Sequence, residues 1–99
     1  MFAVKIKRKA LRKLEKLSAK RKQYIKTVIL ILKTDPIPFK KVDICKLQGH
    51  DNTYRIRVGN LRIVYQVLWN EKTTLIHYIE PERKPTYNKG LGGYIVWQN

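Results

Sequence analysis

The sequence predicts an α+β fold, with an N-terminal strand and a two-helix hairpin packed on one face of an antiparallel sheet. Three observations predict it. Apolar residues alternate with lysines over residues 2–7, apolar spacing becomes helical between residues 9 and 34, and alternation returns after residue 52. A period of two is typical of strands, and a period near 3.6 is typical of helices. Because 99 residues suit one core, we expect a single domain over residues 1–99.

The first half contains the predicted N-terminal strand and both helices. Residues 2–7 are expected to form the strand, and leucines at helical spacing predict a short amphipathic helix over residues 9–17. Ser18 is a favourable N-cap for a second helix, because its side chain can accept a hydrogen bond from the first turn. That helix should end by Thr34, since the following Asp35-Pro36-Ile37-Pro38 cannot continue it.

The second half is expected to form a β-meander. Gly59-Asn60 is a two-residue turn signal between two alternating segments, and Pro81 closes a third. One extended piece is also expected near Ile44. Residues 88–99 contain several glycines and are expected to be a flexible or docked tail. The predicted strands of the meander cover residues 53–58, 61–69 and 73–80.

The charge balance indicates a polyanionic partner. Lys and Arg number 22 against 7 Asp and Glu, which gives a net charge of +15. Such an excess favours nucleic acid, with an anionic membrane surface as the second interpretation, although any single lysine is better explained as solvated surface. The longest apolar run, Val28–Leu32, is far too short to span a membrane, and no leader is visible.

The cysteine content favours a reducing compartment. Cys45 is the single cysteine, so we expect a cytoplasmic protein in which it is a small buried side chain. No pair of residues has metal-ligand spacing and no glycine-rich loop resembles a nucleotide cradle, so neither a metal nor a cofactor is expected. His77 is expected to be packed within the last strand, and His50 to lie in a turn.

The predicted hairpin brings arginines together. With a two-residue turn, Arg57 faces Arg62 across the strands, and Arg55 shares their side of the sheet. Directly opposed like charges are destabilising, so three guanidiniums here favour a bound phosphate. The alternative is a solvated sheet face whose arginines pair with acidic residues, namely Asp43, Glu80 or Glu82. Arg83, Lys84 and Tyr87 follow the last strand as further candidates for nucleotide contacts.

Three segments resemble the signature of RelE toxins, of the RelE/ParE superfamily of toxin–antitoxin modules. The 35–38 element and residues 43–47 look most like archaeal RelE, and the resemblance covers about residues 1–88. The segments are Lys46-Leu47-Gln48-Gly49, Tyr54-Arg55-Ile56-Arg57-Val58-Gly59-Asn60 and Leu61-Arg62-Ile63-Val64-Tyr65-Gln66-Val67.

The resemblance implies a metal-independent endoribonuclease that cuts mRNA in the ribosomal A site by 2′-OH attack on the phosphodiester. Arg57 and Arg62 would stabilise the reacting phosphate, Arg83 would act at the leaving group, and Arg55 would position the 2′-OH or its phosphate. RNA contacts would come from Arg55, Lys46, Lys84 and Tyr87, the last by stacking on a base. RelE of enterobacteria has lysines where this chain has Arg55 and Arg57, and a guanidinium is a poor base, so the general base stays unassigned.

The resemblance also implies partners and leaves two alternatives. The expected partners are mRNA and rRNA at the A site and an acidic RelB-like antitoxin. One alternative is a ParE-like inhibitor of DNA gyrase, against which Arg62, Arg83 and Tyr87 argue. The other is a non-catalytic homologue that binds only nucleic acid or antitoxin, which would carry the same charge of +15.

Overall fold

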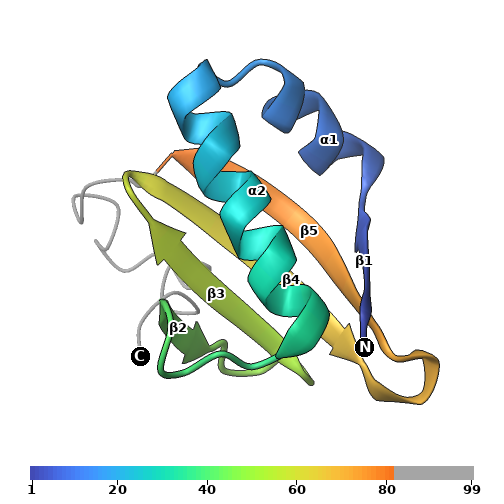
Figure 1. Ribbon diagram of the computed structural model, residues 1–99. Helices are drawn as coiled ribbons and strands as arrows, with labels where there is room; N and C mark the ends of the chain where they lie inside the picture. The colour runs from blue at the N-terminus through green and yellow to red at the C-terminus, as the bar shows by residue number, and fades with distance from the viewer. Residues whose placement is uncertain (82–99) are drawn as a thin grey trace.

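The computed structural model describes residues 1–81, which form two α-helices, a 3-10 turn and a five-stranded sheet (Figure 1). The sheet order is β1-β5-β4-β3-β2. In the described part of the chain, no helix is long and apolar enough to cross a membrane. The elements are β1 Ala3–Ile6, α1 Arg8–Glu15, α2 Ala19–Thr34, β2 Asp43–Lys46, β3 Thr53–Val58, β4 Leu61–Leu68, the 3-10 turn Trp69–Glu71, and β5 Thr73–Pro81.

The sheet is mixed rather than antiparallel. β1 pairs with β5 in parallel, from Ala3 opposite Thr73 to Ile6 opposite Ile76. The expectation of an antiparallel sheet is therefore wrong for this one strand. Alternation shows which side chains share a face, but it carries no information on strand direction. The direction of β1 is set by a partner about 70 residues away, which no local pattern reports.

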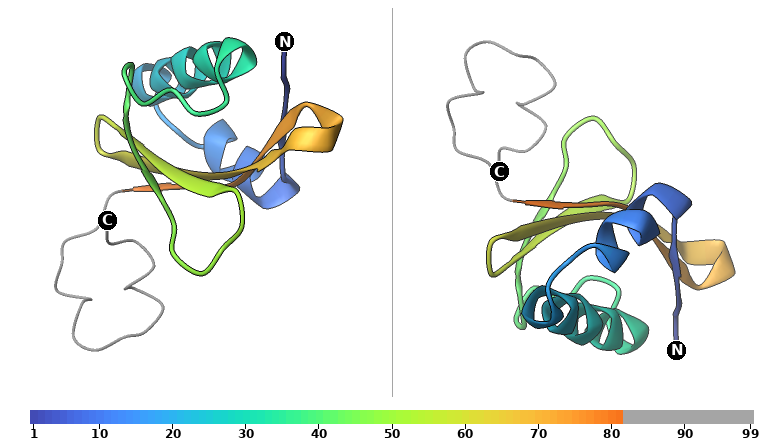
Figure 2. Two further views of the ribbon diagram at one scale, coloured as in Figure 1. Left: turned by 90° about the horizontal axis from the view of Figure 1, so that it is seen from below. Right: turned by 90° about the horizontal axis from the view of Figure 1, so that it is seen from above.

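The two helices take different positions on the sheet. α2 lies across one face, and α1 lies beside β5, close to the level of the sheet (Figure 2). Ser18 caps α2 as expected, since its hydroxyl accepts from the backbone N–H of Arg21 at 3.3 Å. The hydrophobic core lies between α2 and the sheet, and Ala10 adds the contact from α1. Its most buried helix side chains are Ala10, Ile25, Val28 and Leu32.

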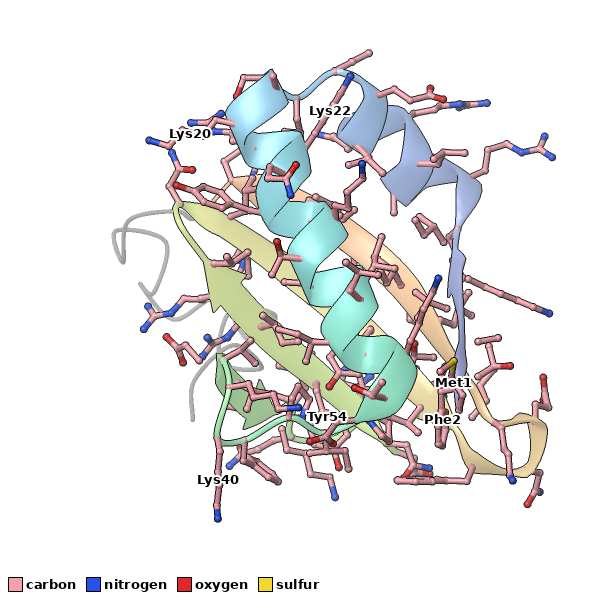
Figure 3. All side chains as sticks on the ribbon, in the orientation of Figure 1. Met1, Phe2, Lys20, Lys22, Lys40 and Tyr54 are labelled. Carbon is pink, nitrogen blue, oxygen red and sulfur yellow. The ribbon has the colours of Figure 1, made fainter. Side chains whose placement is uncertain are left out.

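One buried tyrosine ties the core to the loop after α2. The hydroxyl of Tyr65 donates to the carbonyl of Pro36 at 2.7 Å, and its ring stacks on Tyr54 with centroids 5.8 Å apart (Tyr54 is labelled in Figure 3). Burial raises the pKa of Tyr65 far above its usual value, so its hydroxyl keeps its proton and donates. The contact holds the proline-rich loop against the sheet and so positions β2, which follows that loop.

The β3–β4 hairpin has the predicted two-residue turn. Val58 lies opposite Leu61, and Gly59 has a φ of +59°. This left-handed conformation suits glycine, and a Cβ there would meet the ring of Tyr24 at 2.6 Å. The turn therefore fixes the register of both strands, and with it the side chains that each face presents.

Candidate nucleic-acid interface

Two rows of side chains cross the sheet on the face turned away from the core. The first runs Asp43, Arg57, Arg62, Glu80 and the second runs Cys45, Arg55, Val64, Tyr78, each residue being the Cα partner of the next. Opposed residues in neighbouring strands point to the same side of a sheet. The predicted alignment of Arg57 with Arg62 is thus confirmed, and Arg55 shares their face. We call these eight residues the arginine face.

Carboxylates from the flanking strands hold the arginines. Asp43 Oδ2 accepts from Arg57 Nε at 2.9 Å and lies 2.8 Å from Nη2, while its Oδ1 lies 3.5 Å from Arg55 Nη1. On the other side, Arg62 Nη2 donates to Glu80 Oε1 at 2.9 Å. The acidic pairing that the sequence left open is therefore present for Asp43 and Glu80. Arg57 and Arg62 are each neutralised by a carboxylate of the same chain, so the expectation of a bound phosphate that rested on their repulsion is wrong.

The charges on the arginine face still favour an anion. Among the residues that the structure describes, three guanidiniums share this face with two carboxylates. Arg55 and Arg62 are 7% and 4% exposed, whereas the side chain of Arg57 is 49% exposed. The carboxylates act as braces that fix guanidinium orientation. Arg57 is the arginine of this set that a phosphate in solution reaches most directly.

Cys45 belongs to this face rather than to the core. It is half-buried, and its Sγ accepts from Arg55 Nη2 at 2.9 Å. The expectation of a small buried apolar side chain is therefore replaced by a polar role, because the thiol helps to fix Arg55 together with Asp43.

A β-bulge brings two unexpected residues onto the arginine side of the sheet. The register of β4 with β5 shifts between Val64 and Tyr65, so Ile76 and Ile79 both point into the core. His77 and Tyr78 lie between them and both project to the opposite side. His77 Nε2 lies 3.1 Å from Gln66 Oε1. The sequence signal was present in the three-residue spacing of Ile76 and Ile79, which breaks the period of two.

Burial and a nearby lysine leave His77 with a proton-accepting ring at neutral pH. Burial lowers the pKa of His77 below its usual 6.5, and Lys7 lowers it further. A carbonyl oxygen only accepts, so Gln66 Oε1 is satisfied when Nε2 carries the hydrogen and Nδ1 accepts. In residues 1–81 no cluster of three His, Cys, Asp or Glu side chains could hold a metal.

The family model described as "ParE toxin of type II toxin-antitoxin system, parDE" matches residues 4–84. The chain belongs to the RelE/ParE toxin superfamily. The chain is 40% identical over 78 residues to the Methanocaldococcus jannaschii protein described as "Putative toxin RelE1", and the match covers 79% of this chain and 87% of the relative. These matches make it a toxin of a RelE-type toxin–antitoxin module and confirm the resemblance read from its hairpin.

Solved structures agree with this placement of the toxin. The archaeal RelE–RelB complex from Pyrococcus horikoshii matches with a TM-score of 0.76 and 29% identity, over 84% of this chain and 97% of that one. The RelB–RelE complex from Methanococcus jannaschii matches with a TM-score of 0.68 and 26% identity, over 88% of this chain and 99% of that one. The expected α+β fold is thereby confirmed, with its one parallel strand.

The remaining predicted site residues of the toxin fall in two groups. Lys46 lies opposite Tyr54, whose ring is in the core, so the register places Lys46 on the side of α2 and outside the arginine cluster. The resemblance alone did not give the face of Lys46, because a shift of one position in a strand reverses the face of a side chain. Arg83, Lys84, Tyr87 and the 88–99 tail lie outside the described residues.

Proposed function

We propose that this toxin is a ribosome-dependent endoribonuclease that cleaves mRNA in the A site. The observation that carries the proposal is the braced pair Arg57–Arg62, in register on adjacent strands with Arg55 one row away. Planar guanidiniums match phosphate oxygens and stay charged at every physiological pH. The likeness to RelE toxins supports the choice of RNA as the substrate.

The proposed reaction is an attack of a ribose 2′-OH on the adjacent phosphate, which gives a 2′,3′-cyclic phosphate and a 5′-OH end. Arg57 and Arg62 stabilise the phosphorane charge, and Arg55 positions the 2′-OH or its phosphate. Arg83 serves the leaving oxygen, while Lys84 and Tyr87 bind the RNA. Lys46 contributes only as a long side chain at the sheet edge. No metal or cofactor takes part in this scheme.

The proton of the 2′-OH needs an acceptor other than an arginine, because a guanidinium hardly deprotonates. Among the described residues on the side of the sheet that carries the arginine face, the groups able to accept a proton include the carboxylates of Asp43 and Glu80 and the imidazole of His77. Both carboxylates are engaged with arginines. His77 is neutral at physiological pH, which suits a general base, and it is the first acceptor to test.

The test is cleavage of mRNA by the purified toxin with purified ribosomes. We expect cuts that map to the A-site codon, and loss of cutting in Arg57→Ala and Arg83→Ala. Lys40→Ala is the control that removes one positive charge, because Lys40 is exposed on the loop before β2 and is not part of the arginine face (Figure 3). If mRNA stays intact with the unaltered toxin, the proposal is contradicted.

A gyrase inhibitor is the second candidate, and the match to the ParE family model favours it. In that case mRNA stays intact while DNA gyrase accumulates cleaved DNA in the presence of the toxin. Binding of nucleic acid without cutting of either kind would instead identify a non-catalytic homologue. The same purified protein distinguishes all three outcomes.

We also propose a cytoplasmic complex with an acidic RelB-like antitoxin. The archaeal relatives from Pyrococcus horikoshii and Methanococcus jannaschii were solved as RelE–RelB complexes. The net charge of +15 is complementary to an acidic partner. Co-expression with the neighbouring gene should yield a stable complex with a small acidic protein. A neighbouring product that does not bind would contradict this part.

A further inference from the structure

A groove of about 390 Å³ lies between α1 and the second half of β5. It exists because β1 ends early. Ile6 is the last residue of β1 and pairs with Ile76, so from His77 onward β5 is flanked by a helix in place of a strand. Figure 1 shows α1 beside this half of β5, and Figure 2 shows it close to the level of the sheet.

The helix wall of the groove is cationic. Four of its lining residues are basic and exposed, and they recur at helical spacing, so they form one stripe along α1 and its C-cap. The carboxylate among the described lining residues is Glu80, which already binds Arg62 at 2.9 Å. The stripe consists of Lys9, Arg12, Lys13 and Lys16.

The strand wall connects the groove to the arginine face. Tyr78 and Glu80 line the groove, and their Cα partners on β4 are Val64 and Arg62. Tyr78 is 52% exposed, which is unusual for a large aromatic side chain within a sheet. A chain that is held at the exposed Arg57 and continues across the sheet would therefore meet Tyr78 and then the basic stripe.

We propose that this groove binds the stretch of single-stranded RNA adjoining the phosphodiester held on the arginine face. The stripe contacts successive phosphates, and Tyr78 stacks on a base. The proposal rests on the proposed nuclease function and adds a second RNA-binding site to it. We favour RNA over an acidic peptide because the stripe adjoins the arginine face, where the proposed phosphodiester binds, and because Tyr78 offers an exposed ring on which a base can stack.

Binding of an uncleavable RNA tests the groove separately from catalysis. The probe is a fluorescent 2′-O-methyl oligonucleotide of about twelve nucleotides, long enough for both sites. Its anisotropy is titrated with the full chain at several salt concentrations. The groove variants are Arg12→Gln/Lys13→Gln and Tyr78→Ala. The charge-matched control is Lys40→Gln/Lys41→Gln, on the exposed loop before β2.

The two groove variants should differ in their salt dependence. Loss of two phosphate contacts in Arg12→Gln/Lys13→Gln should weaken binding about tenfold and reduce the slope of log K against log salt by about 1.4. Tyr78→Ala should weaken binding by roughly fivefold to a hundredfold and leave that slope unchanged, because stacking releases no counterions. Circular dichroism confirms that each variant is folded.

Three outcomes would overturn the groove assignment. The first is unchanged affinity in both groove variants, and the second is an equal loss in the Lys40/Lys41 control. The third is a poly-glutamate peptide that needs these residues while RNA does not. The proposed nuclease function can be contradicted independently of the groove. If binding of the probe depends on the groove residues but mRNA stays intact on ribosomes, the groove binds RNA and the nuclease function is contradicted. If Arg12→Gln/Lys13→Gln binds the probe and cuts mRNA normally, the groove assignment is contradicted and the nuclease function is retained.

Discussion

Arg57 and Arg62 lie directly opposite each other on β3 and β4, and each forms an ion pair with a carboxylate on the strand beyond it. The resulting row has the order acid, base, base, acid across four strands. Such a row holds two guanidiniums on one face of the sheet at a small electrostatic cost. A phosphodiester that binds there meets donors already oriented, so little side-chain freedom is lost on binding.

Arg57→Ala should remove activity with little effect on stability. Its side chain and that of Asp43 are about half exposed, so we expect the ion pair to contribute only about 0–1 kcal/mol to stability. Loss of a donor to the transition state should lower the single-turnover rate of mRNA cleavage by about 10²–10³-fold. Urea unfolding and ribosome-dependent cleavage measure the two effects. A Tm drop of many degrees together with normal cleavage would reverse this assignment.

Substitution of Arg62, in contrast to that of Arg57, should lower the stability of the protein. Arg62 is buried and Glu80 is partly exposed, so Arg62→Gln, which leaves Glu80 without this partner, should cost about 1–3 kcal/mol. The double variant Arg62→Gln/Glu80→Gln removes both charges and should recover most of that loss. Chemical denaturation of the two single variants and the double variant forms a mutant cycle. Strict additivity would show that the two residues do not interact.

His77 should make the toxin less stable in mild acid. Its pKa is lowered in the folded protein, mainly by burial, while the unfolded chain binds a proton near pH 6.5. Between that value and the lower folded pKa, the unfolded state holds more protons, so stability falls as the pH drops through this window. His77→Gln should flatten the decline. We expect the Tm difference between pH 7.5 and pH 5 to be smaller in the variant, and an identical difference would contradict the assignment.

Gly59→Ala should destabilise the hairpin. The φ of +59° is strained for alanine, and the added Cβ would meet the Tyr24 ring at 2.6 Å. We expect a loss of roughly 1–2 kcal/mol. Gly59→Ala in a Tyr24→Ala background removes the clash but keeps the backbone strain, so the cost of the glycine substitution should be smaller there. Thermal unfolding of the four proteins separates the two causes, and a stable Gly59→Ala would argue against this turn geometry.

Local pattern alone was enough to predict much of the fold and the centre of the site. A period of two assigned faces to β3 and β4, and Gly59-Asn60 set the register that puts Arg57 beside Arg62. Ser18 and the proline-rich segment marked both ends of α2. These features depend on residues within a few positions of one another, because backbone geometry and short turns are local properties.

Tertiary structure decided everything that needs partners distant in sequence. The parallel pairing of β1, the choice of Asp43 and Glu80 as braces, and the placement of Lys46 all follow from strand order. The bulge that turns His77 and Tyr78 outward arises because β5 must bury Ile76 and Ile79 against the same core. Strand order is set by burial of the whole apolar surface at once, a global free energy that no window of sequence contains.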